Sequence, residues 1–320
     1  MWNRGLCKKS NEYGVLYHTL GDYDKLLEHS EISLKLAIKE FGENHSEVAI
    51  RYNNIGLAWD NKGEYDKAIE FHNRALKIRF ATLGETHPDI AQSYNNIGLA
   101  WDSKGEYEKA IEFYNKSLKI RLATLGEIHP DIAQSYNNIG SAWDRKGEYD
   151  KAIEFYNKAL KIWIATLGEN HPSTATSYNN IGLTWKSKGE YDKVIEFYNK
   201  ALKIYLTTLG ENHPSTATSY NNIGSAWDSN GEYDKAIEFY NKSLKIRLAT
   251  LGEIHPDIAQ SYNNIGWTWY SKGEYEKAIE FYNKALKIWI ATLGENHPNV
   301  KIGKNNLEMA EEKLRESRGD

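Results

Sequence analysis

The sequence is poor in the residues that build covalent cross-links and metal sites. Cys7 is the only cysteine among 320 residues, which excludes an intramolecular disulfide framework and a CxxC metal motif. No apolar run reaches the length of a signal peptide or a transmembrane helix, and the start Met1-Trp2-Asn3-Arg4 carries no such signal. We therefore expect a cytosolic protein that does not associate with a membrane.

The chain also lacks an excess of positive charge. Its 40 Lys and Arg stand against 44 Asp and Glu, for a net charge of -4, so nothing supplies the field that nucleic acid or an anionic membrane would attract. Catalytic patterns are missing too, because the sequence has no Gly-rich phosphate loop, nucleophile elbow or HExxH motif. We expect neither an enzyme nor a bound cofactor or metal.

What fills the sequence is a repeat of 42 residues. The tryptophan of an A-x-W or T-x-W element marks its register at Trp59, Trp101, Trp143, Trp185, Trp227 and Trp269. Self-similarity at a fixed period of this size is typical of a solenoid, in which each repeat buries its apolar face against its neighbours. We expect six full repeats over 46–297, a degenerate capping repeat over 1–45 and a partial repeat or capping helix over 298–320.

Residues 88–129 show what one repeat encodes. Pro88 suits the first turn of a helix, and Tyr94, Ile97, Gly98 and Trp101 form one stripe at helical spacing. Lys104-Gly105 ends this helix A, and a second helix B begins at Glu106-Tyr107 and ends at Gly126. Glu112 and Lys116 make an i, i+4 pair on its outer face. The sequence therefore predicts an all-α fold of antiparallel helix pairs.

The repeat resembles the tetratricopeptide repeat. Gly98, Trp101, Gly105, Tyr107, Ala110, Tyr114 and Ser117 occupy that motif's small and large positions in order. The length of 42 residues, the ending T-L-G-E-x-H-P and the element Tyr-Asn-Asn-Ile-Gly are similar to the subclass of the kinesin light chains. The resemblance covers about residues 10–310 and implies a right-handed superhelical solenoid that binds proteins.

The two ends depart from the pattern as caps would. Gly14, Tyr17, Gly21 and Tyr23 keep the register of the degenerate first repeat, which lacks Tyr-Asn-Asn. Asn305-Asn306 begin a seventh copy, which then becomes charged and stops without a helix B. End repeats need a polar outer face, because that face meets water.

The resemblance also implies a ligand site. Helix A lines the concave groove of such arrays, and kinesin light chains use an asparagine ladder there to hold the backbone of an extended cargo peptide. The matching residues are Asn54, Asn96, Asn138, Asn180, Asn222 and Asn264. An amide offers a peptide group both a donor and an acceptor. The alternative is that Asn–Asn contacts only join neighbouring A helices.

Groove positions that differ between repeats are the candidates for specificity. They read Leu57, Leu99, Ser141, Leu183, Ser225 and Trp267, then Asp60, Asp102, Asp144, Lys186, Asp228 and Tyr270, and then Asn61, Ser103, Arg145, Ser187, Ser229 and Ser271. Kinesin light chains carry more basic residues in this groove, whereas four of the six repeats here carry Asp. That departure favours a neutral or basic peptide. The alternative is a solvated face without a ligand.

The histidines that precede helix A recur too far apart to bind a metal together. His87, His129, His171, His213, His255 and His297 occur once per repeat, without ligand spacing such as H-x3-H. We expect a helix-capping or packing role for them. Where helix B ends, Arg79, Arg121 and Arg247 alternate with Trp163, Tyr205 and Trp289, and we expect this position to be half-buried. Asp and Glu are expected on solvated outer faces.

The sequence predicts a non-enzymatic scaffold that binds an extended peptide segment of a protein partner. Two alternatives stay open. The close likeness of the repeats also suits a self-associating structural rod, and the end after half a repeat suits the sensor array of a larger signalling protein.

Overall fold

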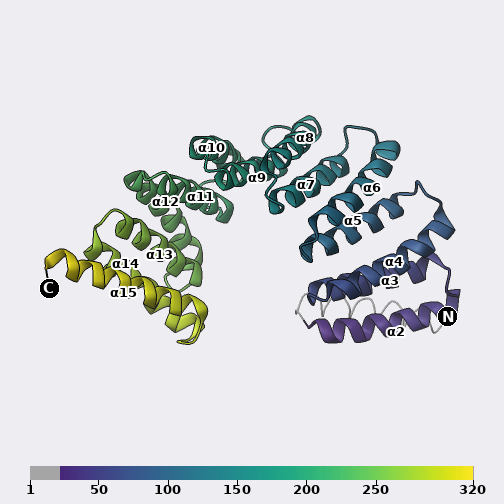
Figure 1. Ribbon diagram of the computed structural model, residues 1–320, viewed down its shortest axis with the longest axis horizontal. Helices are drawn as coiled ribbons and strands as arrows, with labels where there is room; N and C mark the ends of the chain where they lie inside the picture. The colour runs from purple at the N-terminus through teal and green to yellow at the C-terminus, as the bar shows by residue number, and fades with distance from the viewer. Residues whose placement is uncertain (1–21, 320) are drawn as a thin grey trace. The chain divides into compact units, whose positions relative to one another are not determined.

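A computed structural model describes residues 22–319 of the chain (Figure 1). Cys7, Gly14, Tyr17 and Gly21 lie outside the described residues. Within 22–319 the chain forms fourteen α-helices and no strand, which confirms the all-α prediction. The helices are α2 (Tyr23–Phe41), α3 (Ser46–Asn61), α4 (Tyr65–Leu83), α5 (Pro88–Ser103), α6 (Tyr107–Leu125), α7 (Pro130–Arg145), α8 (Tyr149–Leu167), α9 (Pro172–Ser187), α10 (Tyr191–Thr208), α11 (Pro214–Ser229), α12 (Tyr233–Leu251), α13 (Pro256–Ser271), α14 (Tyr275–Leu293) and α15 (Pro298–Arg318).

Each helix A begins where a histidine caps it. In α5 the Nδ1 atom of His87 accepts a hydrogen bond from the backbone N–H of Asp89 at 3.1 Å, and Pro88 fills the first helical position. The same cap starts α3, α7, α9, α11, α13 and α15. The predicted capping role of these histidines is therefore confirmed. A side-chain acceptor here satisfies a backbone donor that the helix leaves unpaired.

Two glycines of each repeat let the two helices meet as a pair. Gly105 turns the chain from α5 to α6 with φ of 86°, which a side chain would strain. Gly98 lies against the ring of Tyr114, and a Cβ at Gly98 would come within 2.7 Å of that ring. The absence of a side chain at Gly98 therefore allows helix A and helix B to approach closely. The outer pair Glu112–Lys116 is confirmed at 2.6 Å.

The chain divides into two compact units, residues 1–166 and 167–320. In each unit the helices follow one another in chain order, and each packs on its sequence neighbours (Figure 1). In unit 1 the core between α6, α7 and α8 contains Tyr114, Leu118, Ile132, Ile139 and Ile162. In unit 2 the core between α12 and α13 contains Ala236, Tyr240, Leu244, Ile258 and Ile265. Repeated positions therefore build repeated cores.

The end of helix B is more buried than the sequence suggested. Trp163 is half-buried as expected, but Tyr205, Trp289 and Arg79 are buried. The expectation of a half-buried position was therefore wrong for these three. Arg79 is buried because its Nη1 atom donates to Ser93 Oγ at 2.7 Å and to the backbone oxygen of Asp89 at 3.0 Å, both on the following helix A. An arginine can thus replace an aromatic ring here by bonding the next repeat.

The last described helix ends the array. α15 has 21 residues, against 16 in the other A helices, and no helix B follows it among the described residues. It continues the register of the repeats, because Asn306 Nδ2 donates to Asn263 Oδ1 at 3.0 Å.

Candidate functional site

The predicted ligand-binding residues lie on one side of the A helices. We call this side the A face; it belongs to α3, α5 and α7 in unit 1 and to α9, α11, α13 and α15 in unit 2. It carries three rows of side chains at the repeat period, which are an apolar row, an amide ladder and a carboxylate row.

The apolar row is exposed. Leu57 and Leu99 are 39% and 38% exposed in unit 1, and Leu183, Trp267 and Met309 are 50%, 42% and 41% exposed in unit 2. Ser141 and Ser225 occupy the same row and are half-buried. Met309 was missed by the sequence analysis, although it stands 42 residues after Trp267. Large apolar side chains that recur along one exposed face are typical of a surface that a partner covers.

The amide ladder joins neighbouring A helices. Asn96 Nδ2 donates to Asn53 Oδ1 of the preceding repeat at 2.9 Å, while its own Oδ1 accepts from Gln92 Nε2 at 2.7 Å. The same Asn–Asn bond recurs at 3.0 Å for Asn138 with Asn95, 3.2 Å for Asn264 with Asn221 and 3.0 Å for Asn306 with Asn263. The alternative of inter-repeat contacts is thus confirmed as one role of the ladder. Peptide binding by the ladder stays a prediction.

The ladder is interrupted in unit 2 at Asn222. Among the described residues, no hydrogen bond joins Asn222 to Asn179, whose Nδ2 donates to Tyr205 Oη instead at 3.5 Å. Thr218 stands where other repeats have the glutamine that orients the amide, and its hydroxyl donates to the backbone oxygen of Pro214. The half-buried Asn222 amide is therefore the ladder position with the most hydrogen-bonding capacity to spare.

The carboxylate row is partly buried, which corrects the expectation that the acidic residues would be solvated. Asp102 is only 7% exposed, and Arg145 of the next repeat donates to its Oδ2 atom at 3.1 Å. Burial raises the pKa of Asp102, and the charge of Arg145 opposes that shift. Arg145 was predicted to select ligand side chains, and in the structure it also joins α5 to α7.

Lys186 has a similar place in unit 2. Its Nζ atom donates to Ser225 Oγ of the next repeat at 2.7 Å, and burial lowers its pKa while the charge of Asp228 opposes the shift. Burial also raises the pKa of Asp60 and of Asp228. Both cations of the A face therefore stand beside carboxylates, which reduces the net charge that a ligand meets.

Trp267 and Tyr270 give the A face an aromatic end in unit 2. Their rings stack with centroids 5.7 Å apart, and Tyr270 also lies 5.5 Å from the ring of Tyr275. Trp267 remains exposed although Tyr270 and Tyr275 are half-buried. The stack holds the indole in place from one side and leaves it available for contact with a ligand.

Features of other functional classes are not found over residues 22–319. In that range no three His, Cys, Asp or Glu side chains gather as metal ligands would. Nor does any described helix combine the length and the apolar character that crossing a membrane requires.

Comparison with known proteins identifies the family. A model of the tetratricopeptide repeat matches residues 6–79, 60–123, 103–162, 131–207, 186–249 and 229–291. The chain belongs to the tetratricopeptide repeat family. Its repeats are of the 42-residue kind seen in kinesin light chains, as their spacing and sequence predicted. Proteins of this family are in general non-enzymatic scaffolds for protein interaction. No curated protein matches the chain.

Solved structures share the repeat architecture. BtubC (BKLC) from P. vanneervenii is 26% identical, with a TM-score of 0.61 over 73% of this chain and 94% of that one. A putative kinesin light chain from Podosopora anserina with nearly identical TPR-like repeats is 23% identical, with a TM-score of 0.58 over 64% and 98% of the chains. RapI in its apo form is 19% identical, with a TM-score of 0.60 over 90% and 97%. The last two likenesses concern the fold alone.

Proposed function

We propose that this tetratricopeptide repeat protein is a non-enzymatic scaffold that holds an extended peptide segment of a partner protein on its A face. The apolar row carries the proposal, because Leu57, Leu99, Leu183, Trp267 and Met309 all remain exposed at the repeat period. An array without a ligand would gain solubility from polar residues there, as Ser141 and Ser225 illustrate at the same position.

The polar rows suit the same ligand. Asn222, whose amide makes no bond to Asn179, is our first candidate for a hydrogen bond to the ligand backbone, since an amide can pair with a peptide group in both directions. Carboxylates accompany the apolar row at Asp60, Asp102, Asp144 and Asp228. Because these groups outnumber Arg145 and Lys186, the A face favours a neutral or basic segment.

The experiment uses substitutions that the chain already contains at the same position. Peptides selected from a random display library on the wild-type protein would be titrated by fluorescence anisotropy against Leu99→Ser and Trp267→Ser. Serine occupies this position in two native repeats, so the fold is retained, while each change should weaken binding about tenfold or more. Asn222→Ala should weaken all selected peptides together, and Lys186→Asp should change their ranking by charge.

Unchanged affinity in both serine variants, with intact helical content, would rule out the A face as the ligand site. The self-associating rod would then be the leading alternative, and sedimentation of the wild-type chain over a range of concentrations would measure it directly.

A further inference from the structure

Two isoleucines outside the A face are the most exposed large apolar side chains of the described chain. Ile128 is 67% exposed and Ile254 is 71% exposed, and each lies in the loop between a helix B and the next helix A. The same loop position holds Thr86, Asn170, Asn212 and Asn296 in the other repeats. Four polar choices show that the loop does not need an apolar residue in order to fold.

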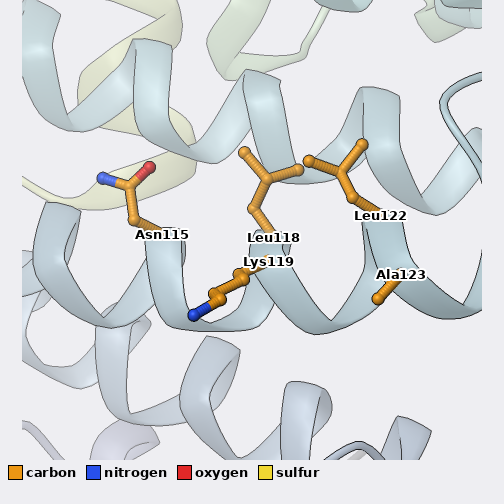
Figure 2. Close-up of a pocket in the computed structure, with 5 residues that line it drawn as sticks. All are labelled: Asn115, Leu118, Lys119, Leu122 and Ala123. Atoms are coloured by element: carbon orange, nitrogen blue, oxygen red, sulfur yellow. The ribbon is translucent and has the colours of Figure 1, made fainter.

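Ile128 borders an apolar hollow in unit 1. Leu122 of α6, Tyr136 of α7, and Ile162 and Ala165 of α8 line this hollow, whose volume is about 380 Å³. It extends along α6, where Leu118 and Leu122 lie one turn apart on the same face of the helix (Figure 2). We call this region, from Leu118 through Ile128 to Ala165, the Ile128 surface. It is built mainly from B helices, so it is separate from the A face.

The charges at the border are mostly positive. Lys119, Lys158 and Lys161 line the Ile128 surface, against the single acidic residue Glu127. Lys158 pairs with Glu154 at 2.7 Å. Over residues 22–319, neither Lys119 nor Lys161 forms an ion pair, and both are exposed. This local excess is opposite in sign to the net charge of -4 of the whole chain, so the surface favours an acidic ligand.

The sequence repeats this surface in unit 2. Every residue that lines the hollow recurs 126 positions later, as Leu248, Glu253, Ile254, Tyr262, Lys284, Lys287, Ile288 and Ala291. Leu248, Tyr262 and Ile288 pack against the core of unit 2 there, as their counterparts do in unit 1. An exposed isoleucine thus occurs only where the rest of the apolar and basic set also occurs.

We propose that the Ile128 surface, and its counterpart around Ile254, docks an acidic amphipathic segment of a partner protein. A large apolar side chain of the segment enters the hollow beside Leu122 and Ile162, and acidic side chains of the segment pair with Lys119 and Lys161. The apolar contact provides most of the affinity, and the lysines select for negative charge.

The test uses the full chain and a synthetic probe. The probe is a short fluorescein-labelled peptide in which glutamates flank two leucines one helical turn apart. One control peptide has serine in place of leucine, and the other has lysine in place of glutamate. Binding is measured by anisotropy for the wild type, for the Ile128→Asn, Ile254→Asn double variant and for the Lys161→Glu, Lys287→Glu double variant. Asparagine is the residue that three native repeats carry in this loop, so thermal melting followed by circular dichroism should be unchanged.

We expect the acidic leucine peptide to bind the wild type and both control peptides to bind far more weakly. The isoleucine double variant should lose about tenfold in affinity, and the lysine double variant should come to prefer the lysine peptide. Equal binding by the isoleucine double variant, or equal binding of the lysine peptide by the wild type, overturns the proposal. A wild-type dimer that becomes a monomer in the isoleucine double variant also overturns it, because a second copy would then be the occupant. The A-face variants Leu99→Ser and Trp267→Ser should leave this binding unchanged, so the two proposals can fail separately.

Discussion

At the scale of single residues, His72 is a departure of one repeat from the others inside the core. It occupies the position of Tyr114, Tyr156, Tyr198, Tyr240 and Tyr282. Its side chain is 1% exposed, and neither ring nitrogen has a hydrogen-bond partner among the described residues. Burial lowers the pKa of His72 to about 4, and the nearby charge of Arg79 acts in the same direction. The imidazole is therefore neutral in the folded protein at neutral pH.

This burial predicts a loss of stability in acid. The unfolded chain binds a proton at His72 near pH 6.5, whereas the folded chain does so only near pH 4. The free energy of unfolding should therefore be highest above pH 6.5 and should fall by about 3 kcal/mol between pH 6.5 and pH 4 through this residue. Denaturant titrations across that range would measure it.

The control for this prediction is His72→Tyr, which gives the repeat the residue of its five siblings. Gly56 leaves space for the ring as Gly98 does for Tyr114. Subtracting the two pH profiles removes the contribution of every other titrating group. Parallel profiles would contradict the role of His72.

At the scale of the element, each helix A depends on a cap that its histidine provides. His129 Nδ1 accepts from the backbone N–H of Asp131 at 3.1 Å, and Pro130 fixes the first turn of α7. Histidine is not among the commonest capping residues, which is why the sequence left open whether it capped or packed. The regular histidine spacing at the loop between helices was the signal that could be read.

We predict that His129→Ala lowers the free energy of unfolding by about 1 kcal/mol, because it removes the acceptor for an unpaired backbone donor. His129→Asn is the matched control, since asparagine caps helices well and should retain most of the stability. Thermal denaturation of both variants at neutral pH would separate the two roles. If both lose the same stability, the imidazole contributes by packing rather than by capping.

At the scale of the whole molecule, the chain forms two compact units whose contacts lie mainly between sequence neighbours. Stability in such an array is close to a sum of repeat and nearest-neighbour contributions. A defect in one repeat should therefore weaken its own unit first. Trp143 provides a test, because it is half-buried against the core of unit 1 and Lys146 and Lys151 lie 5.0 and 4.3 Å from the centroid of its ring.

Trp143→Ala should cost about 3 kcal/mol, the lower end of the range for buried aromatic side chains, because part of the ring is already exposed. Hydrogen exchange should show faster opening in α7 and its neighbours α6 and α8, with little change in α12 to α14. Trp269→Ala, the equivalent change in unit 2, should reverse this pattern. Uniform acceleration over both units in either variant would mean that the chain unfolds as a single cooperative body.

The sequence by itself determined the architecture of this protein. The 42-residue period fixes which residues are equivalent, and Pro88, Gly105 and Gly126 fix where helices begin and end, because proline and glycine act through their own backbone geometry. The helix pairs, the capping histidines and the Glu112–Lys116 pair were all predictable, since each depends on neighbours within one repeat.

Only the tertiary structure decided how side chains of different repeats meet. The bond from Asn96 to Asn53, the pairing of Arg145 with the buried Asp102 and the bond from Arg79 to Ser93 all join residues of successive helix pairs. Their geometry depends on how one repeat packs on the next, which periodicity does not specify. The hollow beside Ile128 depends on three helices together. The exposed isoleucine was visible in the sequence, but the apolar hollow that it borders was not.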